Sequence, residues 1–245
     1  STVVSWIKGE GGTTVDIRVY RESEDKYYDF TVERRKIEVP TVAYEMLEDN
    51  IGYVQVTEFD EVTSDQYIAA VDDLKAQGME GLIVDIRDNP GGLLSCVVDM
   101  LDYMLPEGTI VYTEDKNGEG DTYTSDAEHY FDLPLAVLVN GNSASASEIF
   151  SGAIQDYETG TIIGTQTFGK GIVQSILPFN DGSAIKITVS RYFTPRGTCI
   201  HGEGITPDVE VDLNEELKTK LTIEKSEDNQ LQKAIENVKE QIAAE

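Results

Sequence analysis

A cluster of serines and a lysine between two glycines are the residues of this chain whose types and spacing suggest chemistry. Residues 143–148 read Ser-Ala-Ser-Ala-Ser-Glu, and residues 168–174 read Phe-Gly-Lys-Gly-Ile-Val-Gln. A serine hydroxyl attacks an acyl carbon when a base removes its proton, and a neutral amine can be that base. Because the chain has only two histidines, we expect a lysine to serve as the base in any acyl-transfer chemistry.

The residues around Lys170 suit a general base. Glycines on both sides let the main chain approach closely, and the apolar residues at 168, 172 and 173 are expected to keep water from the amine. Gln174 lies four residues further on, and an extended chain or a helix places these two positions on about the same side. A neutral amide can orient a lysine without holding it as an ammonium, so Gln174 is predicted to orient Lys170.

The serine cluster lies at an expected turn from a strand to a helix. Residues 135–139 form a short apolar run typical of a buried parallel strand, and residues 148–154 begin a helical pattern of apolar positions. Ser145 would then lie at a helix N-terminus, where the unpaired N–H of Ala146 can stabilise an oxyanion. Residues 89–92, Asn-Pro-Gly-Gly, form a second such turn, and their glycines allow a further N–H to point into the site.

Five segments in this order resemble the carboxyl-terminal processing (tail-specific) serine peptidases, and the resemblance runs from about Ile37 to Val211. The segments are residues 85–93, 143–148, 168–174, 191–197 and 204–208. The resemblance implies that Ser145 is the nucleophile, Lys170 the general base and Gln174 its support. It also implies oxyanion donors at the N–H of Ala146 and of one glycine of the pair at 91 and 92, of which Gly91 is favoured and Gly92 stays open.

The resemblance also implies an α/β fold with a crotonase-like or Clp-protease-like core, here residues 37–215. Residues 1–36 alternate polar and apolar residues around a charged turn, which predicts a hairpin. This part looks like the tail end of a PDZ domain whose carboxylate-binding loop precedes residue 1. Residues 216–245 are expected to form a charged amphipathic tail helix that packs on the core rather than against a second copy.

Local patterns in the central part also indicate α/β architecture. Residues 63–66, Thr-Ser-Asp-Gln, predict a capping-box helix start, with Gly78 just past the helix end. The Asp-Gly pair at 181 and 182 predicts a hairpin turn. The remaining patterns predict strands at 82–86, 109–113 and 135–140, a helix near 94–104, and hairpin strands at 171–179 and 183–193.

Other catalytic and metal-binding patterns are weaker. The Ser-x-x-Lys spacing at Ser5 and again at Ser183 looks accidental, because the companion motifs of penicillin-binding proteins are missing. A Ser-His-Asp triad would have to use His129 or His201, which are disfavoured but stay open because both lie in expected loops. Residues 115–126 match part of a calcium-loop template without its final glutamate, so a solvated acidic loop is expected. We expect no metal and no cofactor.

Charge excludes some partners. A net charge of −27 on 245 residues repels nucleic acid and anionic lipid, so we expect neither as a partner. No apolar run approaches 18 residues and no signal peptide is visible. Since the chain starts without methionine, we expect an exporting signal or anchor outside the residues shown. Cys96 and Cys199 leave both disulfide pairing and compartment open.

The expected function is a serine endopeptidase that cuts near the carboxyl end of unfolded or tail-marked proteins through an acyl-enzyme. Its partners would be proteins or peptides with accessible carboxyl termini, homo-oligomers are possible, and the resemblance implies an extracytoplasmic location (periplasmic, membrane-attached or secreted). Two alternatives remain. One is a catalytically idle protein-binding module of the same fold, and the other is an acyl hydrolase that uses the same dyad on esters or small amides.

Overall fold

The computed structural model describes residues 2–36, 39–126, 128–220 and 222–244. The chain folds as two compact units, residues 1–39 and residues 40–245. In the first unit, β1 (Thr14–Arg21) pairs antiparallel with β2 (Lys26–Glu33) across the 3₁₀ turn η1 (Glu22–Glu24), which confirms the predicted hairpin. A short helix, α1 (Thr2–Ile7), precedes the hairpin. The assignment of this unit to a PDZ domain stays a prediction.

The second unit is built on a six-stranded sheet whose strands are parallel except for the edge pair β3 and β4. The short 3₁₀ turn η2 (Glu48–Asn50) joins these two strands. Both central strands, β5 and β8, are buried along their whole length, as their apolar sequences predict. In spatial order the strands are β12 (Val209–Glu210), β9 (Thr161–Gly164), β8 (Leu135–Val139), β5 (Gly81–Asp85), β4 (Ile51–Val56) and β3 (Val42–Met46).

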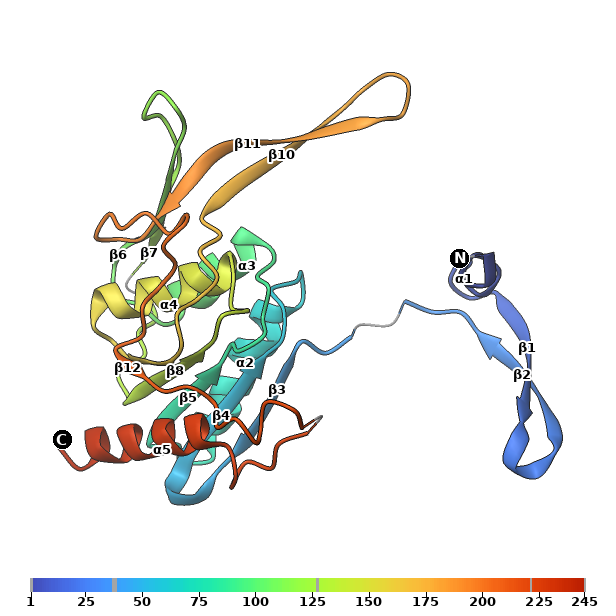
Figure 1. Cartoon of the computed structure of the whole chain (residues 1–245), viewed down its shortest axis with the longest axis horizontal. Coiled ribbons are helices and arrows are strands. Elements are labelled where there is room, and N and C mark those ends of the chain that lie inside the picture. The colour runs from blue at the N-terminus through green and yellow to red at the C-terminus, as the bar shows by residue number, and fades with distance from the viewer. Residues whose placement is uncertain (1, 37–38, 127, 221, 245) are drawn as a thin grey trace. The chain divides into compact units, whose positions relative to one another are not determined.

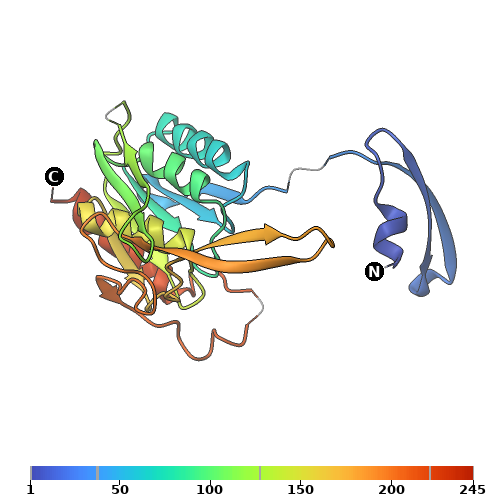
Figure 2. The same cartoon turned by 90° about the horizontal axis from the view of Figure 1, so that it is seen from above.

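Helices cover both faces of this sheet (Figures 1 and 2). Side chains of α2 (Thr63–Ala76), α3 (Leu94–Asp102) and α4 (Ala146–Tyr157) belong to the larger apolar core on one face. On the other face, α5 (Asn229–Ile242) buries Leu231, Ala234 and Val238 against the sheet. The C-terminal helix therefore packs on the core, as predicted, and residues 216–245 lie in the same compact unit as that core.

A four-stranded antiparallel sheet extends from this α/β core. It has the order β10 (Ile172–Pro178), β11 (Ala184–Phe193), β6 (Gly108–Glu114) and β7 (Thr122–Ser125). Strands β10 and β11 form the predicted hairpin, and Gly182 in its turn has a φ of 84°. Only the last residues of β11 pair with β6, so most of the hairpin projects from the core as a two-stranded ribbon (Figures 1 and 2).

The predicted capping box at the start of α2 is not formed. The helix begins at Thr63 as expected, but Val62 is the N-cap residue and no side chain caps it. The Thr63 hydroxyl lies 2.6 Å from the hydroxyl of Thr41, and Gln66 Oε1 accepts the N–H of Thr41 at 3.0 Å. The side chains of Thr63 and Gln66 therefore bond to Thr41, just before β3, instead of capping the N-terminus of α2.

The segment that resembles a calcium loop, residues 115–126, covers the turn between β6 and β7 and β7 itself. Asp115 Oδ1 accepts the N–H groups of Asn117 and Glu119, at 2.7 and 3.0 Å. This carboxylate therefore closes a hairpin turn. Within the described ranges, no cluster of three or more His, Cys, Asp or Glu side chains is arranged to hold a metal ion.

None of the helices in the described ranges is both long and apolar enough to cross a membrane. Cys96 is buried and Cys199 is half-buried, and both are free thiols.

Candidate active site

The turn after β5 is built around a buried amide, Asn89. Its Nδ2 donates to the carbonyl of Val56 at 2.9 Å, and its Oδ1 accepts the N–H of Gly91 at 2.9 Å. Gly91 and Gly92 have φ values of 100° and 152°, which favour glycine. A Cβ at position 91 would lie 2.8 Å from Ser145 Cβ, and one at position 92 would lie 2.0 Å from the carbonyl oxygen of Phe59. Gly91 therefore lets this turn touch the serine turn, and Gly92 lets it lie against the main chain of Phe59.

The three serines of the cluster have different roles. The hydroxyls of Ser143 and Ser147, both fully buried, donate to the carbonyls of Ile86 and Asn89 at 2.8 and 2.9 Å. These bonds join the turn after β8 to the turn after β5. The Ser145 hydroxyl is partly exposed and donates a hydrogen bond to no group in the described ranges. Of the three hydroxyls it is the one whose proton is not already donated to a described group.

Ser145 has a strained main chain at the N-terminus of α4. Its φ of 58° and ψ of −113° are unusual for a residue other than glycine and cost about 1–3 kcal/mol. The following residue, Ala146, makes no hydrogen bond through its N–H to any described group, as expected for the first residue of a helix. This N–H and the positive end of the helix dipole therefore lie directly beside the Ser145 side chain.

The glycine whose N–H has no partner differs from the glycine that the sequence favoured as an oxyanion donor. The N–H of Gly91 is already bonded to Asn89, so it cannot donate to an oxyanion in this arrangement. The N–H of Gly92 has no acceptor among the described residues. Gly91 still approaches Ser145 and Ala146 closely, but the free donor of the glycine pair is Gly92.

Glu148 joins the serine turn to the lysine loop, a role that the sequence analysis missed. Its fully buried carboxylate accepts two main-chain N–H groups on Oε2, from Ser145 at 2.9 Å and from Lys170 at 2.8 Å. On Oε1 it accepts the Thr167 hydroxyl at 2.7 Å and the N–H of Gly169 at 2.6 Å. Because one oxygen receives both bonds, the main chains at Ser145 and Lys170 are neighbours. The Ser-x-x-Glu spacing at 145–148 is that of a capping box and could have revealed the bond from Ser145 to Glu148, but not the bonds to the lysine loop.

The loop that carries Lys170 is supported from behind by residues 200–204. Gly169 has a φ of 86°, and its carbonyl accepts the N–H of Gly202 at 2.9 Å. A Cβ at Gly171 would lie 2.4 Å from the main-chain nitrogen of His201, so both glycines allow close approach of the two segments. The main chain of this loop is therefore as well held as that of the serine turn.

The Lys170 side chain itself is exposed. Its Nζ makes no hydrogen bond or ion pair with any residue of the described ranges. Phe168, expected to shield the amine, is 64% exposed, because the β10–β11 ribbon projects from the core and no described element packs over it. Phe168 therefore does not form its part of the predicted apolar shield, whereas Ile172 and Val173 are half-buried.

Gln174 lies in β10 and is also exposed. Its side chain makes no hydrogen bond in the described part of the chain. The pairing of β10 with β11 shifts between Val173 and Gln174, because β11 has one extra residue there, Val189. The fold thus brings the main chains at Ser145 and Lys170 together, whereas no hydrogen bond links the side chains of Ser145, Lys170 and Gln174.

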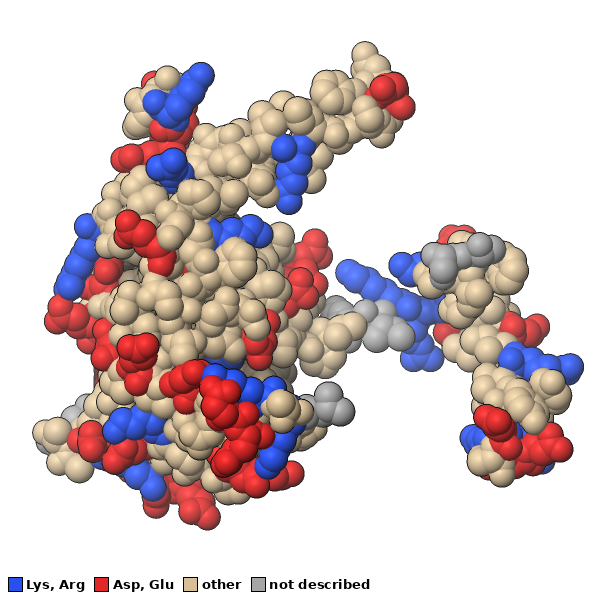
Figure 3. Space-filling view, viewed as in Figure 1, with Lys and Arg blue, Asp and Glu red and all other residues tan. Residues whose placement is uncertain are grey.

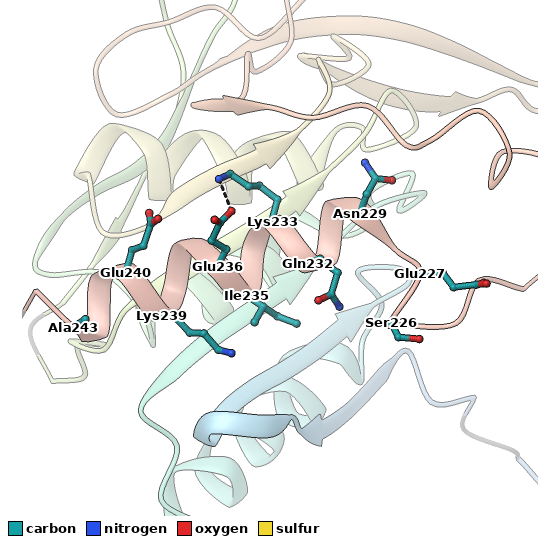
Figure 4. Close-up of a pocket in the computed structure, with 10 residues that line it drawn as sticks. All are labelled: Ser226, Glu227, Asn229, Gln232, Lys233, Ile235, Glu236, Lys239, Glu240 and Ala243. Carbon is teal, nitrogen blue, oxygen red and sulfur yellow. Dashed lines mark hydrogen bonds and ion pairs between the residues drawn. The ribbon is translucent and has the colours of Figure 1, made fainter.

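The two histidines do not complete a triad in this arrangement. His129 is exposed, with its ring 5.3 Å from that of Tyr103, and His201 is exposed beside the lysine loop. Neither imidazole bonds to the Ser145 hydroxyl within the described ranges. A hollow of about 830 Å³ lies along α5 and is lined by Lys233, Glu236 and their neighbours (Figure 4). Neither histidine and none of Ser145, Lys170 and Gln174 lines it.

Comparison with known proteins shows the family of this chain. Residues 50–211 match the family described as peptidase family S41. The carboxyl-terminal-processing protease of Synechocystis sp. is 38% identical over 206 residues, which cover 82% of this chain and 48% of that protein. The carboxy-terminal-processing protease of Bartonella bacilliformis is 41% identical over 217 residues, 85% of this chain and 49% of that protein. The chain therefore spans about half the length of these curated relatives.

Solved structures agree as well. The photosystem II D1 C-terminal processing protease aligns with a TM-score of 0.67 at 32% identity, covering 83% of this chain and 57% of that one. A protein described as a putative S41 protease from Bacteroides fragilis has a TM-score of 0.68 at 18% identity, covers 95% of this chain and 67% of that one, and shows the shared fold alone. The sequence match, the fold and the arrangement around Ser145 lead to one conclusion: this chain belongs to peptidase family S41.

Proposed function

We propose that this chain carries the catalytic core of a serine endopeptidase that cuts near the carboxyl end of its protein substrates. The observation that carries the proposal is the state of Ser145. It is the member of its cluster whose hydroxyl donates to no described group, its main chain is strained, and it precedes an unpaired N–H. Strained main chain beside free N–H donors is typical of a catalytic nucleophile.

The reaction follows from these groups. Ser145 Oγ attacks the scissile carbonyl while the neutral amine of Lys170 takes its proton and later delivers it to the leaving amine. The N–H groups of Ala146 and Gly92 stabilise the oxyanion. Water then hydrolyses the acyl-enzyme with Lys170 again as the base. The mechanism uses Lys170 as a neutral amine, and a bound polypeptide that excludes water from the side chain favours that form. Gln174 orients the amine once it is covered.

The substrate and the location are part of the same proposal. The curated relatives are named for carboxyl-terminal processing, which supports polypeptides with accessible carboxyl termini as substrates. The N-terminal hairpin unit is the end of a PDZ domain, and the protein works outside the cytoplasm. Both statements rest on the resemblance of residues 85–208 to the family.

An idle binding module remains the second candidate, and one observation favours it. No hydrogen bond joins Ser145 and Lys170 through their side chains in the described ranges, as would be expected of an idle module. Digestion of an unfolded protein with an apolar carboxyl terminus separates the two candidates. Cleavage, followed by product masses, is expected for this chain and absent for Ser145→Ala. Equal cleavage by both chains would remove Ser145 from the mechanism, and peptide binding without cleavage by either would favour the idle module.

A further inference from the structure

One edge of the four-stranded sheet is free at β10. This strand is the last in its sheet and pairs with β11 alone in the described part of the chain. At one end the carbonyl of Gly171 accepts the N–H of Tyr192 at 3.0 Å, and at the other the N–H of Phe179 donates to Ser183 at 2.7 Å. Odd-numbered residues of β10 thus face β11. Alternation along a strand then turns the N–H and C=O groups of Ile172, Gln174 and Ile176 outward.

The end of this edge is also defined. Pro178 falls at the next outward position and has no N–H to offer, which is where edge strands tolerate proline. The extra residue in the β10–β11 pairing, Val189, lies on β11 and leaves the alternation of β10 intact. Three consecutive outward positions of β10 are therefore ready to pair with one more strand.

The free edge starts at the candidate catalytic residues. Ile172 lies two residues after Lys170, whose N–H is bonded to the same Glu148 oxygen as the N–H of Ser145. A chain that pairs with β10 at Ile172 is thus led towards Ser145. The edge continues the site without a break, since Gly171 alone separates Ile172 from Lys170.

The ribbon differs from the rest of the surface in charge and polarity. Residues 170–193 contain three basic residues and one acidic residue in a chain of net charge −27. Figure 3 shows the projecting ribbon as largely uncharged, whereas acidic side chains are spread over the core below it. Ile176, Leu177 and Phe179 are 66%, 47% and 53% exposed. An extended apolar peptide fits this surface, and a strongly basic one does not.

We propose that β10 binds the substrate polypeptide as an added strand, through the main-chain groups of Ile172, Gln174 and Ile176. This inference rests on the proposed function and names how the substrate is held. Pairing through the main chain accepts many sequences, while the exposed apolar side chains of the ribbon favour apolar ones. The enzyme would then select extended, unfolded segments rather than a particular residue at the cleavage site.

Binding to the Ser145→Ala chain tests the proposal without requiring cleavage. The probe is a ten-residue peptide of Ala, Val, Ser and Gln with a free carboxyl terminus, in which each amide is N-methylated in turn. Loss of one main-chain hydrogen bond is expected to weaken binding about three- to tenfold. Because alternate residues of an added strand face β10, the weakening is expected at every second position.

A substitution in the strand gives a second test. Ile176→Pro removes one outward N–H but none of the hydrogen bonds to β11, and Ile176→Ala is the matched control that keeps the N–H. We expect Ile176→Pro to lower kcat/KM about three- to tenfold further than Ile176→Ala, mainly through KM. Circular dichroism and thermal unfolding of both variants check that the hairpin persists.

The outcomes are distinct. An even response to N-methylation, equal kinetics of the two variants, or no binding of the peptide would overturn the proposal. If Ile176→Pro changed the oligomeric state and left peptide binding unaltered, the edge would belong to a second copy of the chain and the proposal would also fail. Alternating loss of binding together with no cleavage by the unsubstituted chain would support strand addition and overturn the peptidase function instead.

Discussion

The turn that carries Ser145 and the loop that carries Lys170 share a carboxylate but differ in their surroundings. Ser145 lies between two buried serines that are bonded to main-chain carbonyls, and it starts a helix buried in the core. Lys170 has an equally well-held main chain, yet its side chain is exposed and the strand after it leads into a projecting ribbon.

This difference indicates how the site is organised. In the proposed mechanism, the core positions the nucleophile and the oxyanion donors, so they would need little rearrangement when substrate binds. The proposed base is anchored only through its main chain, and its amine would require a covering polypeptide before it could work. On this proposal Ser145 is preorganised, whereas the environment of Lys170 is completed by binding.

Substitutions of Lys170 are expected to have the largest effect on activity. Lys170→Ala is expected to lower kcat at least about a thousandfold, because the proton of Ser145 then has no acceptor. Lys170→Arg is expected to fail equally, since a guanidinium is not a base at accessible pH. Because the Lys170 side chain is exposed and makes no hydrogen bond or ion pair with a described residue, the melting temperature of both variants is expected to stay unchanged. Cleavage by either variant at the original rate would place the base elsewhere, and His201→Ala would then be assayed.

Glu148→Gln tests the link between the two regions. Each carboxylate oxygen of Glu148 accepts two hydrogen bonds. A glutamine replaces one of these oxygens with an NH₂ group, which cannot accept the two bonds that this oxygen received. We expect a loss of about 1–3 kcal/mol in the free energy of unfolding, measured by urea denaturation. We also expect a 10- to 100-fold fall in kcat with a smaller change in KM, because the Ser145 and Lys170 main chains separate. A fall in stability with unchanged kcat would make Glu148 structural only.

Substitutions of Ser143 and Ser145 compare a bonded serine with a free one. Ser143 donates to Ile86 and accepts the N–H of Asn140 at 3.0 Å, so Ser143→Ala is expected to cost about 1–2 kcal/mol of unfolding free energy. The loss for Ser145→Ala is expected to be smaller, since its hydroxyl donates to no described group. Activity should show the reverse order. Urea denaturation of the two variants checks the first statement, and equal losses would contradict the distinct roles given to the serines.

The rates at which the two cysteines are modified compare the two regions, and this is the smallest effect that we expect. Cys96 lies in the buried helix after the glycine turn, and burial raises the pKa of its thiol to about 11. Cys199 is half-buried and pairs opposite Phe193 in the segment that supports the lysine loop. Iodoacetamide at pH 8 is expected to modify Cys199 long before Cys96. Comparable rates would show that the core side opens as readily as the base side.

The raised pKa also sets the sign of a pH effect. The unfolded thiol loses its proton near pH 9 and the folded one near 11, so stability from Cys96 is complete below pH 9 and falls as pH rises towards 11. The expected loss is about 1 kcal/mol at pH 10. Cys96→Ala should remove this part of the alkaline slope of unfolding free energy. An unchanged slope would exclude Cys96 as its cause.

Much of the local structure was predictable from the sequence because it depends on neighbouring residues. The apolar runs at 82–86 and 135–140 are central strands, and the Asp-Gly turn closes the β10–β11 hairpin. The Ser/Thr-x-x-Glu/Gln pattern shows the limit of such reasoning. It occurs at Thr63, where it forms no capping box, and at Ser145, where it does. The local spacing is the same in both places. The capping box is missing at Thr63 because Thr63 and Gln66 bond to Thr41, which is distant in the sequence.

The sequence by itself determined the α/β elements, the family resemblance and the candidate residues Ser145, Lys170 and Ala146. Tertiary structure alone decided that Glu148 joins the serine and lysine segments, and that Gly92 rather than Gly91 keeps a free N–H. It also decided that Lys170 stays exposed beside a free sheet edge. The physical reason is that hydrogen-bond partners and burial depend on segments brought together by folding, whereas residue periodicity and turn preferences act over a few neighbouring positions.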